Sequence, residues 1–342
     1  MGRQSTFKAA IVSFFMFGSQ LNAKPFYDYC LNPENQAQRQ TVIAVMIKMK
    51  IQDRLNEENC RLASDLLRER SYLSIYPDPF EPARGPANDL RPIEDEIQIR
   101  SISLAKNEIT DISPLVNFRD LTQLNINFNP VSDITAVARF GMLEEIGATE
   151  TNVTDLRPLA GLSRLRELSL AKTGVSDLSP LIKLANLKVL FLSHNKIRDL
   201  SPLKNMALEY LHIEDNQIAE LDVSAAKSSL AMLDVSYNAL TEITSLKDLQ
   251  KIDAISIGHN QFSSVEDFSN LRTLRWLDIR HNIISKIDAL ANLTDLEYLI
   301  IEDNHICEIP ASIRALQLDH LNSKGEWIKL EITGEGQQTG CQ

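Results

Sequence analysis

The stretch Leu187-Lys188-Val189-Leu190-Phe191-Leu192-Ser193-His194-Asn195 decides the fold of this chain of 342 residues. It carries leucines at its first, fourth and sixth positions and an asparagine at its ninth. The pattern returns along the chain, always around an asparagine or threonine that we call the anchor. The anchors are Asn107, Asn129, Thr151, Thr173, Asn195, Asn216, Asn238, Asn260, Asn282 and Asn304. Every interval is 22 residues except the 21 between Asn195 and Asn216, so the sequence contains ten tandem repeats in register.

One such unit cannot bury its apolar side chains alone, but stacked units share a continuous core and a parallel sheet. We expect the leucines to point inward from a short strand and the turn before it. The anchor follows that strand, where its amide can pair with backbone groups of the turn that would otherwise be buried and unpaired. Threonine at 151 and 173 offers only one hydroxyl for this task.

The second half of the unit contains an aspartate and, in several repeats, a Ser-Pro pair. Examples are Asn107-Glu108-Ile109-Thr110-Asp111-Ile112-Ser113-Pro114-Leu115 and Asn195-Lys196-Ile197-Arg198-Asp199-Leu200-Ser201-Pro202-Leu203. The aspartate can cap a short helical turn, and proline is tolerated in the first turn of a helix. Each repeat is therefore predicted to return from its strand through a short helical turn.

These stretches resemble the internalin-type leucine-rich repeats of bacterial surface and secreted proteins. The resemblance covers roughly Ile97 to Leu316 and implies an exported protein that binds a partner through the concave face of the repeats. Repeats 6 to 10 mostly lose the Ser-Pro pair, and the N-terminal cap differs and contains a cysteine pair. The implied fold therefore carries over more firmly than any implied host receptor.

The fold class predicted from these patterns is an α/β solenoid, a curved leucine-rich-repeat right-handed superhelix with its parallel β-sheet on the concave face. We expect a signal peptide at 1–23, a helical N-terminal cap with a proline-rich loop at 24–92, ten repeats at 93–316 and a C-terminal cap at 317–342. Arg3 and Lys8, the apolar run from Ala9 to Phe17 and the small residue Ala23 have the layout of a secretory signal. The expected location is secreted or periplasmic, with no transmembrane segment.

Both ends of a stacked sheet expose core and edge strands that need a cap. Gln36 to Arg70 is predicted to be helical, and Trp327 to Ile332 alternates like a strand. Four cysteines in an exported chain suggest two disulfides, for which the sequence allows three pairings; they are Cys30, Cys60, Cys307 and Cys341. Local pairing, Cys30–Cys60 and Cys307–Cys341, is the simplest geometry and predicts a disulfide-stapled C-terminal cap.

Composition and motifs narrow the class of function. The formal net charge of −11 argues against nucleic acid or an anionic membrane as the main partner. The sequence has no G-x-S-x-G, no H-E-x-x-H and no phosphate-cradling glycine loop, so we predict neither an enzyme nor a cofactor. His259, His281 and Asp303 would be neighbours and offer a metal-site or hydrolase alternative, which we do not favour. A structural envelope or matrix protein is the other alternative, and the oligomeric state is left open.

Residues between the leucines should point out of the concave sheet. The sixth residue before each anchor, from the second repeat onward, gives the series Gln123, Glu145, Glu167, Val189, Tyr210, Met232, Ala254, Trp276 and Tyr298. Its later half is apolar and aromatic, and such patches usually mark binding sites. The partner-binding residues predicted from it are Phe191, Tyr210, Met232, Tyr237, Trp276, Asp278, Tyr298 and Ile300. The alternative is that the rings pack on one another and only stiffen the sheet.

Charge on the same face is uneven. The outward positions of repeats 6 to 10 carry nine acids and two bases, against four acids and five bases in repeats 1 to 5. The acids are Glu209, Glu214, Asp215, Asp234, Asp253, Asp278, Glu297, Glu302 and Asp303, and the bases are Arg275 and Arg280. A protein partner with a basic surface would be steered there, with Asp278 acting as a rim charge. The simpler alternative is a solvated acidic face that keeps the protein soluble.

Overall fold

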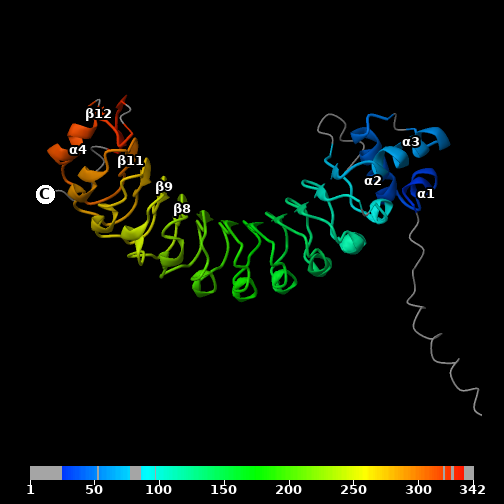
Figure 1. Ribbon diagram of the computed structural model, residues 1–342, viewed down its shortest axis with the longest axis horizontal. Coiled ribbons are helices and arrows are strands. Elements are labelled where there is room, and N and C mark those ends of the chain that lie inside the picture. The colour runs from blue at the N-terminus through cyan, green and yellow to red at the C-terminus, as the bar shows by residue number, and fades with distance from the viewer. Residues whose placement is uncertain are drawn as a thin grey trace, which may run out of the picture.

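The computed structural model describes residues 25–51, 54–77, 86–96, 98–318, 320–324 and 327–334. The predicted signal peptide at 1–23 lies outside these residues. The described chain forms an arc of stacked repeats with a helical region at the N-terminal end (Figure 1). The strands line the inner side of the arc and the short helical turns lie along its outer side, so the sheet occupies the concave face (Figure 1).

The main sheet has twelve strands in the order β1-β2-β3-β4-β5-β6-β7-β8-β9-β10-β11-β14, and all of its pairings are parallel. Each strand has three residues, and β3 to β11 begin at the residues that the sequence assigns to the outward series. The bounds are β1 Tyr72–Ser74, β2 Ser101–Ser103, β3 Gln123–Asn125, β4 Glu145–Gly147, β5 Glu167–Ser169, β6 Val189–Phe191, β7 Tyr210–His212, β8 Met232–Asp234, β9 Ala254–Ser256, β10 Trp276–Asp278, β11 Tyr298–Ile300 and β14 Glu331–Thr333. The predicted solenoid and its register are therefore confirmed.

The leucines form the core as expected. In the repeat of anchor Asn195, Leu187, Leu190 and Leu192 are each 0% exposed. The middle residue of β6, Leu190, points inward, while Val189 and Phe191 on either side of it remain partly exposed. Burying one such side chain is worth about 2 kcal/mol, and the same three positions repeat along the arc.

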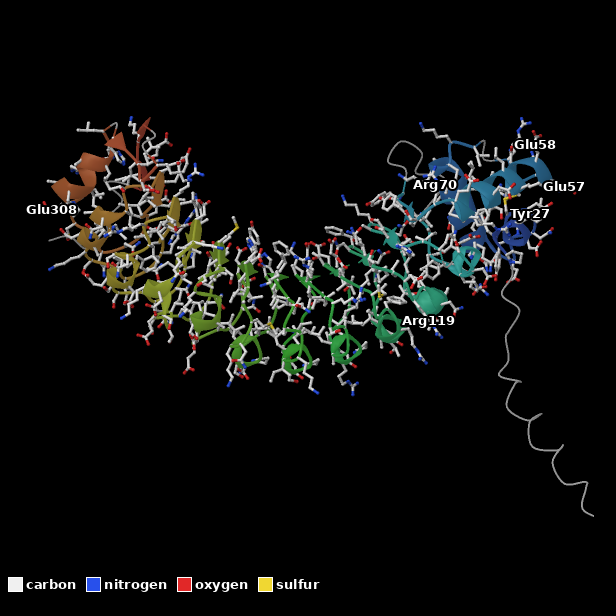
Figure 2. All side chains as sticks on the ribbon, in the orientation of Figure 1. Tyr27, Glu57, Glu58, Arg70, Arg119 and Glu308 are labelled. Atoms are coloured by element: carbon white, nitrogen blue, oxygen red, sulfur yellow. A yellow bond between two sulfur atoms is a disulfide. The ribbon has the colours of Figure 1, made fainter. Side chains whose placement is uncertain are left out.

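Short 3₁₀ turns connect the strands along the outer side. They are η2 Arg91–Ile93, η3 Ser113–Asn117, η4 Thr135–Arg139, η5 Arg157–Leu159, η6 Ser179–Leu181, η7 Ser201–Leu203, η8 Ser224–Ala226, η9 Leu246–Asp248, η10 Glu266–Phe268 and η11 Asp288–Asn292. Arg119, which follows η3, lies on this side (Figure 2). The predicted aspartate contact is present but one residue earlier than a usual N-cap, because Leu200 is the N-cap and the Asp199 carboxylate accepts the N–H of Ser201 at 2.8 Å.

The anchors join neighbouring repeats as well as closing their own turn. Asn129 Nδ2 donates to the carbonyl of Ile126 in its own repeat at 3.0 Å and to that of Leu104 in the preceding one at 2.9 Å. Its Oδ1 accepts the N–H of Ile109 of the preceding repeat at 3.0 Å. Thr151, by contrast, donates only to Ala148 of its own repeat, at 2.7 Å. Thr151 therefore lacks the side-chain link between repeats that the asparagines provide, whereas Thr173 keeps one, because its hydroxyl donates to Asn195 Oδ1 of the next repeat at 3.1 Å.

The N-terminal region is helical, as predicted. It contains α1 Phe26–Leu31, α2 Gln36–Lys48 and α3 Glu57–Arg68. A disulfide joins Cys30 of α1 to Cys60 of α3, which confirms that pairing. Tyr27, Glu57 and Glu58 lie at the end of this region that is farthest from the repeats (Figure 2). In the described part of the chain, no helix is long and apolar enough to cross a membrane.

The sheet extends beyond the predicted repeats at both ends. β1 lies within the segment that the sequence assigns to the cap, and Ile75 after it donates its N–H to Ser103 O at 2.8 Å. At the other end, α4 Ala311–Leu316 covers the last repeat, and β12 His320–Leu321 pairs with β13 Trp327–Ile328. The single strand predicted over Trp327 to Ile332 is wrong, because the chain divides it between β13 and β14.

The predicted Cys307–Cys341 bridge involves a residue, Cys341, that lies outside the described residues. Among the described cysteines none is a free thiol. The Cys30–Cys60 bridge belongs to the N-terminal region. The stapled C-terminal cap therefore stays a prediction.

Core side chains around the one short repeat are slightly more exposed than their counterparts elsewhere. The residue missing between Asn195 and Asn216 falls between η7 and β7, so that the strand register of Val189 with Tyr210 is preserved. Core side chains around this site, such as Leu200 and Leu221, are 6% and 7% exposed, whereas their counterpart Leu178 is 1% exposed. The solenoid therefore absorbs the deletion as slightly looser packing on its outer side, away from the concave face.

Candidate binding face

The first residue of every strand in the main sheet points out of the concave face, and we call this series the first column. Paired registers place its members side by side from Tyr72 to Glu331, with Tyr210 next to Met232 and Trp276 next to Tyr298. Neighbouring strands lie about 4.8 Å apart. The apolar and aromatic members predicted from the sequence are thus brought onto one continuous line.

Exposure along this line is uneven in a way that suits contact with another molecule. Tyr210 and Tyr298 are 40% and 46% exposed, and Met232 and Trp276 are partly exposed. Ala254 faces outward but is only 8% exposed, because its short side chain lies between Met232 and Trp276. Among the described residues no ring contact joins Trp276 to Tyr298. Ring packing that only stiffens the sheet is therefore not seen in the first column.

The third residue of each strand forms a second outward series beside the first column. In it Phe191 stacks on His212 with ring centroids 4.9 Å apart. Burial lowers the pKa of His212, against the opposing charges of Asp234 and Glu214. Ile300 lies near the C-terminal end of the series, next to Thr333 in register, and is partly exposed. Phe191 and Ile300 thus lie beside the first column as predicted.

Asp278 is not the exposed rim charge that the sequence suggested. Its side chain is 6% exposed, and its Oδ2 lies 2.6 Å from an Arg280 guanidinium nitrogen. Its Oδ1 also accepts the Arg280 N–H at 3.0 Å. Arg280, two residues later, turns back over the strand and covers the carboxylate, which no outward-position rule could predict. A charge reversal at Asp278 would disrupt this pair rather than alter long-range steering.

The residue just before each anchor adopts a left-handed backbone conformation in all ten repeats, and we call these residues the left-handed row. They are Lys106, Phe128, Glu150, Lys172, His194, Asp215, Tyr237, His259, His281 and Asp303, with φ between 50° and 61°. Asp and His are enriched among the few side chains that tolerate this region. The fixed backbone aligns these side chains along one border of the concave face.

Members of the left-handed row touch one another. Tyr237 stacks on His259 with ring centroids 3.8 Å apart, and His259 stacks on His281 at 3.9 Å. The row continues from His281 to Asp303 through a contact of 3.1 Å between Nδ1 and Oδ2. The stiffening alternative thus applies to Tyr237, which nonetheless stays 48% exposed.

The acidic excess of the C-terminal half persists after ion pairing. Both bases of this half are engaged, Arg280 with Asp278 and Arg275 with Glu297 at 2.7 Å. Four acids at outward positions form no ion pair among the described residues, namely Glu214, Asp234, Asp253 and Glu302. The face around the first column therefore keeps a negative potential for a partner to meet.

Two aromatic residues of the concave face were missed by the sequence analysis. Tyr72 is 50% exposed and begins the first column in β1, where Tyr72-Leu73-Ser74-Ile75 repeats the strand pattern without an anchor behind it. Phe128 is 42% exposed in the left-handed row and has the Lys106 ammonium 5.6 Å from its ring centroid. Tyr72 was not predicted because no anchor follows its strand. Phe128 was not predicted because the predicted binding residues were all taken from the later repeats, from Phe191 onward.

Nothing in the described residues points to chemistry on this face. No group of three or more His, Cys, Asp or Glu in the described part of the chain is arranged to hold a metal ion. The His259, His281 and Asp303 set, considered as a metal site from the sequence, is instead a ring stack ending in a carboxylate. The arrangement offers aromatic surface and negative charge.

Comparison with known families finds repeats of the expected kind. The family described as "Leucine Rich repeats (2 copies)" matches residues 97–139 and 185–226, and that described as "Leucine rich repeat" matches residues 206–262. A comparison with curated protein sequences found no match.

Several solved structures share the fold. An internalin from Listeria monocytogenes is similar with a TM-score of 0.69 and 23% identity, over 84% of this chain and 87% of that one. A leucine-rich-repeat protein of Leptospira interrogans gives a TM-score of 0.62 and 18% identity, over 86% and 80%. The plant peptide hormone receptor RGFR1, in complex with RGF2, gives 0.52 and 16%, over 72% and 49%. At these identities the likeness concerns the fold alone, a fold that is generally non-catalytic.

Proposed function

Because the chain is a leucine-rich-repeat protein, we propose that it is an exported protein-binding module rather than an enzyme. Its binding site is the C-terminal half of the concave face, built on the first column from Tyr210 to Tyr298. The observation that carries this proposal is the line of outward aromatic and apolar side chains, exposed without a folding reason. Trp and Tyr are the residues most enriched at the energetic centres of protein interfaces.

Charge supports a partner with a basic surface. The four unpaired acids at outward positions surround the first column, and no unpaired arginine or lysine of repeats 6 to 10 stands among the outward positions. Complementary charge speeds association and disfavours acidic competitors. The likeness of the fold to a plant receptor solved in complex with RGF2 supports the general use of such an arc for binding another molecule.

Export to a secreted or periplasmic location is part of the proposal. The basic residues and apolar run at 1–23 support it, and so does the Cys30–Cys60 disulfide, because disulfides persist mainly in oxidising compartments. A second bridge, Cys307–Cys341, would fasten the C-terminal cap to the last repeat.

Peptide mapping of the unreduced protein should recover Cys30–Cys60 and Cys307–Cys341 as its only two bridges. In the chain-entropy description, closing loops of this length contributes on the order of 3–4 kcal/mol each, so reduction should lower the melting temperature markedly. A free thiol at Cys307, or a bridge between the two ends of the arc, would contradict the proposed C-terminal cap.

Site-specific photo-crosslinking of the exported protein tests the binding site. A photo-reactive amino acid placed at Met232 or Tyr298 should crosslink one defined partner. The matched control is Ile182, which is 58% exposed and follows η6 on the outer side of the arc. Crosslinks from Ile182 but not from the first column would place the binding face elsewhere. Crosslinks that join only copies of this chain into extended arrays would favour the alternative of a structural matrix protein.

A further inference from the structure

Two histidines and a tyrosine of the left-handed row form one continuous stack on the border of the proposed binding face. The planes of Tyr237 and His259 are inclined by 13°, and those of His259 and His281 by 26°. Asp303 closes the stack through its contact with His281. All four side chains are held by left-handed backbone, which limits how far each can move away while the turn stays intact.

The two histidines have different charged neighbours. A proton on His281 lies against the Asp303 carboxylate. A proton on His259 lies against a second imidazole and meets the like charge of the Arg280 guanidinium, while the Asp278 carboxylate, which would favour the proton, is already paired with Arg280. Burial, followed by the charges of His281 and Arg280, lowers the pKa of His259, and Asp278 and Asp303 act in the opposite direction. Glu302 and Tyr237 complete the titratable surroundings through their interaction with Arg280.

We propose that the stack of Tyr237, His259 and His281, closed by Asp303, is a proton-sensitive element that weakens the hold of the concave face on a basic partner in mild acid. The part of this inference that concerns a basic partner, called the partner half below, rests on the proposed function. The part that concerns protonation of the stack, called the proton half, rests on the geometry of the stack.

The sign of the effect follows from where the charge appears. While the imidazoles carry no proton charge, Asp303 adds to the acidic face. A proton on His281 places a cation against Asp303 and cancels its charge. A second proton places like charges on rings whose centroids are 3.9 Å apart, which favours opening of the stack. Because the pKa of His259 lies below its ordinary 6.5 in the stack, protons bind the open arrangement more tightly, and the stack loses stability as pH falls below that value.

A second pair on the same border changes charge in the same direction. His194 Nδ1 lies 2.8 Å from Asp215 Oδ2. A proton on His194 cancels the charge of Asp215 as His281 does for Asp303. Protonation of both histidines would thus cancel negative charge at both ends of the C-terminal half. There Asp215 and Asp303 otherwise add to the charge of the unpaired Glu214 and Glu302.

Histidine-resolved NMR titration of the free full-length protein tests the proton half without any partner. The His259 signal, assigned by its loss in His259→Gln, should titrate below the ordinary histidine pKa of 6.5, and the Tyr237 ring signals should shift with it. A His259 signal that titrates at or above 6.5, while Tyr237 stays unchanged, would overturn the inference whether or not the concave face binds a partner.

Binding of a decalysine peptide, used as a basic probe, tests the partner half at pH 7.5 and 5.5. Lysine and ordinary carboxylates keep their charges over this interval, so histidines dominate any change. The dissociation constant should rise about fivefold to tenfold in the parent protein, the scale of two exposed charge pairs. The ratio should fall part of the way in the double variant His259→Gln and His281→Gln, because the His194–Asp215 pair remains. It should fall toward one when His194→Gln is added, and it should not change in the control His305→Gln.

The outcomes separate this inference from the proposed function. Suppose that decalysine binding does not change with pH, while Trp276→Ala abolishes binding of the captured partner. Only the proton-sensitive element is then overturned. An unchanged pH ratio in the double variant has the same consequence. If Trp276→Ala binds the captured partner as tightly as the parent, the proposed binding site fails, while the NMR titration still decides whether the stack responds to protons.

Discussion

Replacing Trp276 with alanine is expected to weaken partner binding by at least about 2 kcal/mol, the usual threshold for an interface hot spot. Trp276 lies in the middle of the apolar part of the first column, between Ala254 and Tyr298 in register. Its ring is partly exposed and contacts no other described ring, so its surface is available to a partner. Affinity should be measured by titration calorimetry with the partner captured by crosslinking.

The fold should tolerate this change. Trp276 is outside the leucine core, and losing its cover over Ala254 should cost only about 1 kcal/mol of stability. The matched control is Glu145→Ala, at the same strand position in the N-terminal half, where the affinity should change little. If Trp276→Ala unfolds the protein, the ring is structural. If it changes neither affinity nor melting temperature, partner contact occurs on another surface.

Replacing Asn260 with alanine should destabilise the solenoid by about 3 kcal/mol, the scale expected when several buried backbone groups lose their partners. Its Nδ2 donates to Val235 O at 2.9 Å, Ile257 O at 3.0 Å and Gly258 O at 3.2 Å. Its Oδ1 accepts the N–H of Leu240 at 3.0 Å. The loss therefore loosens the joint between two repeats as well as one turn, and chemical denaturation measures it directly.

Two neighbouring variants calibrate that result. Gln261→Ala should leave stability within about 0.5 kcal/mol, because the Gln261 side chain is exposed. Asn260→Thr should fall between the two, because Thr151 shows that a threonine anchor keeps the bond within its own repeat, Thr151 Oγ1 to Ala148 O. Equal melting temperatures for Asn260→Ala and Gln261→Ala would contradict the anchor register.

The periodic features could be predicted from the sequence because each depends on neighbours at a fixed spacing. The anchors, the inward leucines and the first column follow from a period of 22 residues and the alternation of a strand. Asn107 shows the limit of this reasoning at the N-terminal end. Its Nδ2 donates to the carbonyl of Ile75, directly after β1, a strand that lacks an anchor of its own and so was assigned to the cap.

Features that depend on how side chains turn within the face could not be predicted. Asp278 occupies an outward position, yet Arg280 folds back over it and removes it from solvent. The stack of Tyr237, His259 and His281 requires both the left-handed backbone before each anchor and the stacking distance between repeats. The sequence placed His259, His281 and Asp303 as neighbours and left a metal site open as an alternative that was not favoured, because spacing alone does not distinguish chelating side chains from stacked ones.

Acrylamide quenching of Trp276 fluorescence tests the central claim, that the C-terminal half of the concave face binds the partner. The chain has two tryptophans, so a Trp327→Phe variant isolates the signal of Trp276. Adding the captured partner should reduce the quenching of Trp276 and shift its emission to shorter wavelength, because the ring becomes covered. Unchanged quenching and emission, at partner concentrations that saturate binding, would contradict the claim.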